Sequence, residues 1–283
     1  MDRFADRQSL ADALFERRRA GLKIALVPTM GNLHAGHLEL VKQAKQHADY
    51  VVATIFVNPL QFGPDEDLDA YPRSLDNDCH LLTTVQCDAV FHPPVSEVYG
   101  DTPLSEQTIV HVPGVSSGYC GDSRPGHFDG VATVVCKLFN LVLPDLAVFG
   151  LKDYQQFLVI QKMVQDLCMP ITLHGVEIVR EESGLAMSSR NGYLTETQKT
   201  QATILHKILQ HTLQQIQDGQ RNYAALEKSA SEQIREHGLR PDYFAICAAD
   251  TLKPASSDDH SLVLLTAAYL GNSRLIDNLR FHL

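Results

Sequence analysis

The chain has 283 residues, of which 44% are hydrophobic and 20% are charged, which fits one large or two smaller globular domains without a biased tract. Its formal net charge of −10 argues against binding of nucleic acid by phosphate neutralisation, because that mode requires clustered Lys and Arg. Since the N-terminus is charged, no apolar stretch approaches ~20 residues and the six cysteines form no CxxC pair, we expect a cytoplasmic protein with reduced thiols and no membrane partner.

Short runs rich in Val and Ile alternate with longer segments of helical period in the first part of the chain. The strand-like runs are 23–28, 50–57, 88–91, 107–112 and 145–149, and the helical segments include 36–47, 72–86, 128–142 and 153–167. This alternation predicts an α/β fold with a mostly parallel sheet and helices on both faces. Ligands bind outside the carboxyl ends of the strands in such sheets, so we expect the functional site there.

The turn after the first run reads PTMGNLHAGH, residues 28–37, and places His34 and His37 around a glycine at the start of a helix. A helix N-terminus offers free N–H groups and a positive dipole end, and imidazole N–H groups can donate to phosphate oxygens. We therefore interpret this turn as a phosphate-binding site, since the chain lacks GxxxxGK[ST] and GxGxxG. The alternatives are structural histidines and a zinc site, for which no third ligand stands at suitable spacing.

Two polar segments follow further along the chain. Asn58 and Gln61 flank Pro59 in the turn after the run 50–57, and amide side chains suit an uncharged polar group of a ligand. The glycine-rich loop 116–131 carries Arg124 and His127 and precedes a helix. This loop either closes over a site or is an ordinary connection.

The segment GLKDYQQ, residues 150–156, follows the run 145–149 at the start of a helix. Lys152 can neutralise charge on a transferring phosphoryl group, and Gln156 can hold hydroxyl or carboxylate oxygens of a small substrate. The alternative is an Asp153 that caps the helix beside a solvated lysine.

The pattern changes after about residue 177, so we predict one domain over residues 1–177 and a smaller α+β domain over 178–283. The second part contains helical patterns at 195–218 and 222–237 and strand-like runs at 241–249, 261–270 and 273–280. Its first segment includes MSSRN, residues 187–191, in which two hydroxyls and the fork of Arg190 can grip phosphate oxygens. A solvated loop is the alternative interpretation.

Six blocks, PTMGNLHAGH, FVNPLQFG, YPRS, RPGHFDGV, FGLKDYQQ and MSSRNGYL, in this order resemble the pantoate–β-alanine ligase family of the HxGH nucleotidyltransferase superfamily. The resemblance implies a Rossmann-like N-terminal domain, a smaller C-terminal domain that closes over ATP, and a homodimer. It also implies a two-step reaction, in which (R)-pantoate attacks the α-phosphorus of ATP to give pantoyl adenylate, and the amine of β-alanine then displaces AMP.

The same resemblance implies the residues of the site. His37 falls at the position of a proton donor with His34 as its partner, and Lys152 and Arg190 would stabilise phosphates. The ATP-binding residues would be Met30, Gly31, Asn32, Leu33, His34, Ala35, Gly36, His37, Gly150, Leu151, Lys152, Asp153, Val179, Met187, Ser188, Ser189 and Arg190. The residues for pantoate and β-alanine would be Gln61 and Gln156 with Asn58 beside them, and we add Arg124 and His127 from the glycine-rich loop.

Magnesium is expected to accompany ATP as its phosphate-bridging ion. The family offers a carboxylate toward magnesium after YPR, where this chain reads Leu75-Asp-Asn-Asp78, so Asp78 is the candidate ligand and Asn77 argues against a carboxylate pair. Leu151 stands where relatives often have glutamate, a position that need not contact the ligand through its side chain.

Three other functions are weighed against this interpretation. A related nucleotidyltransferase with a phosphorylated acceptor would call for more Arg or Lys than the amides Asn58, Gln61 and Gln156 provide. The acidic composition argues against a tRNA-charging enzyme, because such an enzyme has to bind nucleic acid. A nucleotide sensor without catalysis would have no need of groups aimed at a transition state.

Overall fold

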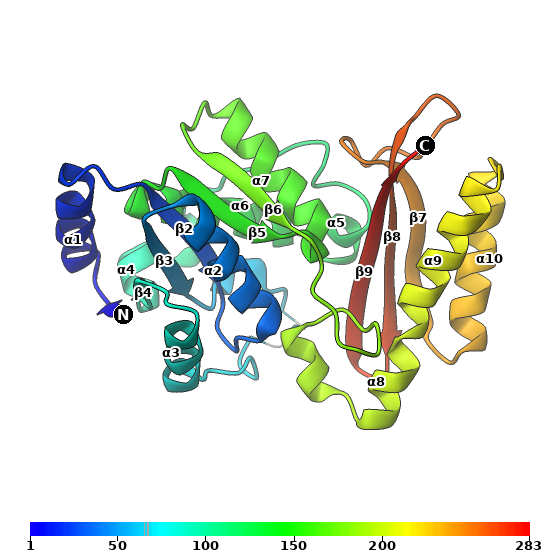
Figure 1. The fold of residues 1–283 in the computed structure, drawn as a ribbon, viewed down its shortest axis with the longest axis horizontal. Helices are drawn as coiled ribbons and strands as arrows, with labels where there is room; N and C mark the ends of the chain where they lie inside the picture. The colour runs from blue at the N-terminus through cyan, green and yellow to red at the C-terminus, as the bar shows by residue number, and fades with distance from the viewer. Residues whose placement is uncertain (65, 67) are drawn as a thin grey trace. The chain divides into compact units, whose positions relative to one another are not determined.

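The computed structural model describes residues 1–64, 66 and 68–283, and this part of the chain divides into two compact units (Figure 1). Unit 1 comprises Met1–Leu151 and Gln156–Glu177, and unit 2 comprises Lys152–Gln155 and Ile178–Leu283. Helix α7 (Tyr154–Asp166) and the short helix η3 (Leu151–Asp153) therefore contain residues of both units.

Within the described residues, unit 1 contains a six-stranded parallel sheet with the strand order β1-β4-β3-β2-β5-β6. The strands are β1 (Asp2–Phe4), β2 (Ile24–Thr29), β3 (Tyr50–Ile55), β4 (Ala89–Phe91), β5 (Leu146–Gly150) and β6 (Thr172–Val176). The helices are α1 (Arg7–Arg19), α2 (Ala35–His47), η1 (Pro59–Gln61), α3 (Leu75–Thr84), α4 (Val95–Tyr99), η2 (Leu104–Glu106), α5 (Cys120–Ser123) and α6 (His127–Val142).

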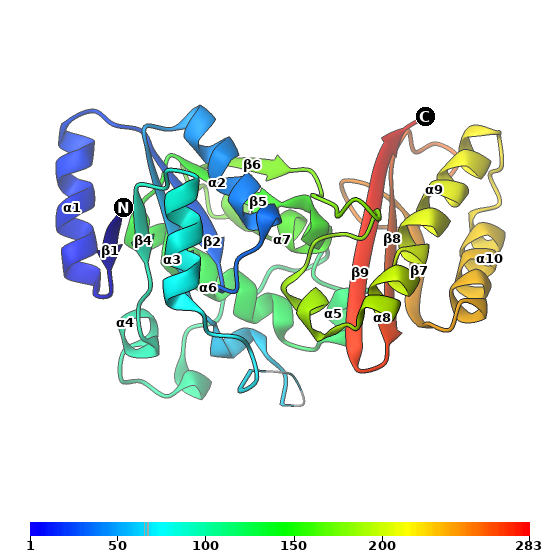
Figure 2. The same ribbon diagram turned by 60° about the horizontal axis from the view of Figure 1, so that its bottom comes forward.

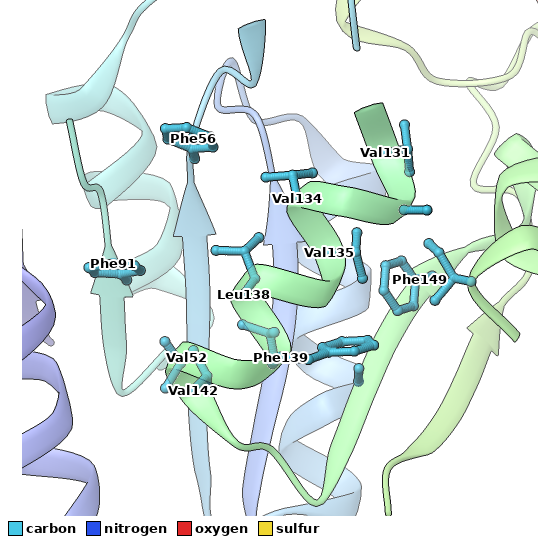
Figure 3. Close-up of a cluster of buried hydrophobic side chains, with 14 of the residues drawn as sticks. Val52, Phe56, Phe91, Val131, Val134, Val135, Leu138, Phe139, Val142 and Phe149 are labelled. Atoms are coloured by element: carbon cyan, nitrogen blue, oxygen red, sulfur yellow. The ribbon is translucent and has the colours of Figure 1, made fainter. Parts of the chain in front are cut away.

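Helices cover both faces of this sheet, as the sequence predicts. In β2, Ile24 and Leu26 belong to one buried cluster with residues of α1, α6 and α7, whereas Ala25 and Val27 belong to the opposite cluster with α2 and α3. Figure 3 shows the first cluster, in which α6 lies against the strands. Because both faces are buried, the central strands are apolar at successive positions rather than at alternate ones.

The prediction of a strand at 107–112 is wrong. This segment forms no strand, and the N–H of Val110 donates instead to Oγ1 of Thr133 at 2.9 Å while Val112 is buried. The segment is thus a connection without strand pairing, and its apolar residue Val112 is buried all the same. Strands β1 and β6 lie at the two edges of the sheet and outside the predicted runs, because short or half-exposed edge strands lack a continuous apolar pattern.

Unit 2 contains, in its described residues, a three-stranded antiparallel sheet with the order β7-β8-β9 (Figure 2). The elements are η4 (Ser189–Tyr193), α8 (Glu196–Ala202), α9 (Ile204–Gln217), α10 (Tyr223–Glu236), β7 (Arg240–Ala248), β8 (Ser261–Leu270) and β9 (Ser273–His282). Residues of α9 and α10 pack on the sheet in one buried cluster. The pattern predicted as one helix over 195–218 is divided at Thr203, whose N–H and hydroxyl both donate to the carbonyl of Thr200.

The fold class is therefore confirmed as a parallel α/β sheet unit with a smaller α+β unit. Searched over the residues described, the structure contains no helix that is both long and apolar enough to cross a bilayer.

Candidate active site

The predicted segments of unit 1 follow neighbouring strands. Strand β2 lies between β3 and β5, where the order of connections reverses, and this point of an open parallel sheet is the usual place for a ligand. Met30–His37 follows β2, Asn58–Gln61 follows β3, and Gly150 ends β5. The parallel register places these three strand ends at one edge of the sheet.

The turn after β2 has an unusual backbone. Gly31 and Asn32 both adopt left-handed conformations, with φ of 83° and 50°. A Cβ at Gly31 would lie 3.0 Å from Oδ2 of Asp78, so this turn requires glycine for space as well as for its dihedral angle. Asp78 accepts hydrogen bonds from the N–H groups of Asn32 at 2.9 Å and Leu33 at 2.8 Å. A residue of α3 thus holds the backbone of the turn immediately before His34.

His34 and His37 are brought together at the N-terminus of α2, with ring centroids 4.1 Å apart. Nδ1 of His34 accepts the N–H of Gly36 at 3.1 Å, and Nδ1 of His37 accepts the N–H of His34 at 3.3 Å. Because Nδ1 is an acceptor in each ring, the proton of each neutral imidazole is on Nε2. The two rings therefore carry Nε2–H donors, which suits the oxygens of a phosphate.

Asn58, which caps η1, and Gln61, which ends it, form a buried amide pair and are 1% and 8% exposed. Nδ2 of Asn58 donates to Oε1 of Gln61 at 3.0 Å and to the carbonyl of Gly130 at 3.1 Å. Tyr99, whose pKa is raised by burial, donates from its hydroxyl to Oδ1 of Asn58 at 2.6 Å. Nε2 of Gln61 lies 3.1 Å from Sδ of Met30. Asn58 thus orients Gln61 next to the turn that carries the histidines.

Gly130 makes this arrangement possible because α6 approaches η1 closely. A Cβ at Gly130 would lie 2.5 Å from the carbonyl carbon of Leu60 and 2.7 Å from Cα of Gln61. Any larger residue would push the helix away from the turn, because backbone atoms cannot yield as a flexible side chain can.

Arg124 and His127 lie beside the Gln61 turn. Nη1 of Arg124 is 2.9 Å from Nε2 of His127, and Nδ1 of His127 is 2.9 Å from the carbonyl oxygen of Gln61. Since Arg can only donate, Nε2 of His127 accepts and Nδ1 carries the proton toward Gln61. Arg124 also binds Glu66 through two contacts of 2.6 Å; although burial opposes it, this guanidinium holds the pKa of Glu66 below its ordinary value. The loop 116–131 is thereby attached to the turn that contains Gln61.

Gln156 and Leu151 differ in what they offer to a ligand. Gln156 is half-buried in the first turn of α7, which follows β5 after the short helix η3. Leu151 is 3% exposed, and a Cβ at Gly175 would lie 2.7 Å from its Cδ2. The side chain of Leu151 is therefore committed to the interior, and only its backbone is suitable for ATP.

Unit 2 contains the MSSRN segment, of which Ser189–Asn191 belong to the short helix η4 and Met187 and Ser188 precede it. Ser188 caps this helix, and its Oγ accepts the N–H of Arg190 at 3.3 Å. Nδ2 of Asn191 donates to the carbonyl of Ala186 and to Oε1 of Glu181, both at 3.1 Å. Asn191 thus fixes the turn, while Ser189 and Arg190 are half-buried.

A buried ion pair anchors the segment that precedes this turn. Arg180 donates to both carboxylate oxygens of Asp277 on β9, at 2.7 and 2.8 Å, and the N–H of Met187 donates to the carbonyl of Val179 at 3.0 Å. Nδ1 of His206 lies 4.0 Å from the same carboxylate, and this buried atom has no hydrogen-bond partner among the residues that the structure describes. A small pocket within unit 2 is lined by Lys152, Ser188, Asn191, His206 and Asp277, among others.

Sequence reasoning did not find Tyr99, Glu66, Gly130 or Asp277. Gly130 lies within the block RPGHFDGV, whereas the other three lie outside the predicted polar segments. The importance of each residue depends on a contact far along the chain, such as the 41 positions between Tyr99 and Asn58. The spacing of residue types carries no signal for such contacts.

Asp78, the predicted magnesium ligand, is fully buried and both of its carboxylate oxygens accept hydrogen bonds inside the protein. These three hydrogen bonds occupy most of the roughly four acceptor positions of a carboxylate, and its burial suits it poorly to a magnesium ion that keeps several waters. Over the described residues, no three or more His, Cys, Asp or Glu side chains come together as a group that could hold a metal.

The comparisons with known proteins agree with one another. The chain matches the family model for pantoate-beta-alanine ligase over residues 3–280. Pantothenate synthetases of Colwellia psychrerythraea and Pseudomonas putida (strain W619) are 55% and 56% identical, over 94% and 98% of this chain and 94% and 96% of their own lengths.

Solved structures give the same result. The pantothenate synthetase of Thermus thermophilus has a TM-score of 0.89 at 42% identity and 99% coverage of each chain. The pantoate-beta-alanine ligase of Francisella tularensis, complexed with beta-gamma ATP and beta-alanine, has a TM-score of 0.81 at 30% identity, covering 99% of this chain and 97% of its own.

Proposed function

This chain belongs to the pantoate–β-alanine ligase family, and we infer that it is an ATP-dependent ligase that joins (R)-pantoate to β-alanine through pantoyl adenylate. In the first step a carboxylate oxygen of pantoate bonds to the α-phosphorus of ATP and pyrophosphate leaves. In the second step the β-alanine nitrogen bonds to the acyl carbon, AMP leaves and a proton is lost from nitrogen. The observation that carries this function is the His34–His37 pair beside the buried amides Asn58 and Gln61.

The proposed chemistry needs positioning and charge stabilisation more than covalent participation of the protein. We assign His37 as the main donor to the reacting phosphate, through Nε2–H, with His34 as its partner. Lys152 and Arg190 supply positive charge against the phosphate oxygens. The neutral amides Asn58 and Gln61 favour a hydroxy acid as acceptor over a phosphorylated one, which would call for more Arg or Lys.

The remaining assignments are proposals of the same kind. ATP would be bound by the segments Met30–His37, Gly150–Asp153 and Met187–Arg190 and by the backbone of Val179. Pantoate and β-alanine would be bound by Gln61, Gln156 and Asn58, with Arg124 and His127 supporting the Gln61 turn.

Magnesium would enter with ATP, because Mg²⁺ commonly binds substrate phosphates together with water and only one or two carboxylates. The buried carboxylate of Asp78, which already accepts three hydrogen bonds, does not fit a ligand for this ion. When bound, the ion would neutralise phosphate charge.

We further propose that residues 1–177 and 178–283 act as two domains, that the enzyme is a homodimer, and that it works in the cytoplasm. Support for the dimer comes from the family resemblance. The acidic composition and the scattered cysteines support an intracellular enzyme with small-molecule substrates.

The function is tested by measuring pyrophosphate and AMP from purified protein with ATP, magnesium and (R)-pantoate, with and without β-alanine. We expect pantoate-dependent exchange of labelled pyrophosphate into ATP without β-alanine, and AMP with pantothenate only when β-alanine is present. Absence of exchange and of products in every combination would refute the function. Products from a phosphorylated acceptor instead would favour the alternative nucleotidyltransferase.

A further inference from the structure

We propose that Asp78 is a positioning residue for adenylation, which fixes the left-handed turn at Gly31 and Asn32 and thereby holds the His34–His37 pair in place. This inference rests on the proposed function of the histidine pair. It assigns to Asp78 a role through the backbone rather than through a metal.

The contacts of Asp78 all converge on this turn. Its side chain is fully buried in the first turn of α3, and its oxygens accept the N–H groups of Asn32 at 2.9 Å and Leu33 at 2.8 Å. The hydroxyl of Ser74 adds a third hydrogen bond at 3.2 Å. No ion pair to Asp78 occurs among the residues that the structure describes. The N–H dipoles of Asn32 and Leu33 thus stabilise the buried carboxylate, and the carboxylate in turn holds these two residues in place.

The turn needs such a support. Asn32 at a φ of 50° is in a region that costs a non-glycine residue free energy, and such strain persists only where the surroundings over-determine it. The N–H groups of Asn32 and Leu33 point at one carboxylate, so they fix the peptide planes between the end of β2 and His34. His34 is the next residue and caps α2.

The position of the histidine donors therefore depends on the carboxylate of Asp78. His34 orients His37 through the hydrogen bond from its N–H to Nδ1. If the turn relaxes, both Nε2–H groups move relative to the α-phosphate. A displacement of about 1 Å can reduce a rate by on the order of 10²-fold when catalysis depends on positioning.

The test is Asp78→Asn, which keeps the shape but replaces one acceptor oxygen by an NH2 group that cannot accept either N–H. We expect kcat of the pantoate-dependent ATP–pyrophosphate exchange to fall by about 10- to 100-fold. The reaction of β-alanine with separately prepared pantoyl adenylate should fall much less, and the magnesium concentration for half-maximal exchange should not change.

Asp76→Asn is the matched control, because it removes the same charge from the same helix at a side chain that is 99% exposed. It should leave the exchange rate unchanged. Should Asp78→Asn fail to fold, Ser74→Ala removes only the third hydrogen bond, and we expect a selective decrease of exchange by about 3-fold, less than in Asp78→Asn because both backbone hydrogen bonds to the carboxylate remain.

Two outcomes overturn the proposal while wild-type protein remains active. One is a normal exchange rate in folded Asp78→Asn, or in Ser74→Ala if only that variant folds. The other is a rate that excess magnesium restores with a raised half-saturation, which would make Asp78 a metal ligand. Inactive wild-type protein would instead refute the proposed function itself.

Discussion

At the scale of single residues, the ring of His37 combines a structural contact with the proposed catalytic role. Nδ1 of His37 completes the cap of α2 by accepting the N–H of His34, whereas the proposed donor to phosphate is Nε2–H on the other side of the ring. A substitution that removes the whole side chain would mix loss of the cap with loss of the donor. The structural contribution of such a cap is about 1 kcal/mol.

His37→Gln separates the two roles, because glutamine at the third helical position can still accept the N–H of the capping residue. We expect the exchange rate to fall by roughly 10²-fold, the loss of one transition-state donor, with thermal stability near that of wild type. The measurement is kcat of ATP–pyrophosphate exchange together with a melting curve. His47→Gln, at the other end of the same helix, is the control, and near-normal exchange in His37→Gln would contradict the assigned role.

At the scale of elements, the close contact of α6 with η1 determines the position of the turn that contains Asn58 and Gln61. Gly130→Ala places a Cβ against the backbone of Leu60 and Gln61, so the helix must shift. We expect a loss of about 1–3 kcal/mol of unfolding free energy and a raised KM for pantoate. Urea unfolding and initial rates measure both quantities. Gly63→Ala is the control, since its Cβ would come no closer than 3.8 Å to another residue, and equal behaviour of the two variants would refute the packing argument.

The anchor between α9, β9 and the segment before η4 makes unit 2 sensitive to acid. Burial, and then the charge of Arg180, lower the pKa of His206, while Asp277 opposes this shift; Lys152 lines the same pocket. The folded protein therefore keeps His206 neutral where the unfolded chain, with a pKa of about 6.5, already binds a proton. Stability from this residue is complete above the unfolded pKa and is lost as pH falls toward the folded pKa.

We expect the unfolding free energy to decrease between pH 7.5 and 5.5, and the decrease to be smaller in His206→Gln. Urea unfolding at the two pH values measures the difference. His211→Gln is the control, because His211 lies exposed on the same helix. An equal decrease in wild type and His206→Gln would show that other groups carry the acid sensitivity.

At the scale of the whole molecule, the sequence predicts the central strands, the helices on both faces and the turns that carry the site. These features depend on local pattern, such as continuous apolar runs and polar residues at strand ends. Prediction from the sequence fails at 107–112, where apolar residues pack without strand pairing. It also fails at the edge strands β1 and β6. It also misses Tyr99 and Asp277, because partners distant in sequence leave no periodic signal.

The proposed ATP residues are divided between the two compact units, with Met30–His37 in one and Met187–Arg190 in the other. Binding of one ATP by both segments would restrict the motion of the units. We expect the radius of gyration from small-angle scattering to decrease when ATP and pantoate are added together. ATP with β-alanine alone is the control, and superimposable profiles with and without ATP and pantoate would count against closure.

The buried amide pair also has a consequence for molecular discrimination. The carbonyl of Gly130 can only accept, so Asn58 must turn its NH2 toward it and toward Gln61, which leaves the amide oxygen of Gln61 occupied. The NH2 group of Gln61 lies beside the sulfur of Met30, and in the proposed function it is the donor that meets the substrate. If Gln61 binds the substrate as proposed, its NH2 group favours a ligand atom with a lone pair over an N–H group. A pantoate analogue with an amine in place of the oxygen that faces Gln61 would direct an N–H group at the NH2 of Gln61. Two donors cannot form a hydrogen bond with each other, so we expect such an analogue to bind poorly even if its shape fits.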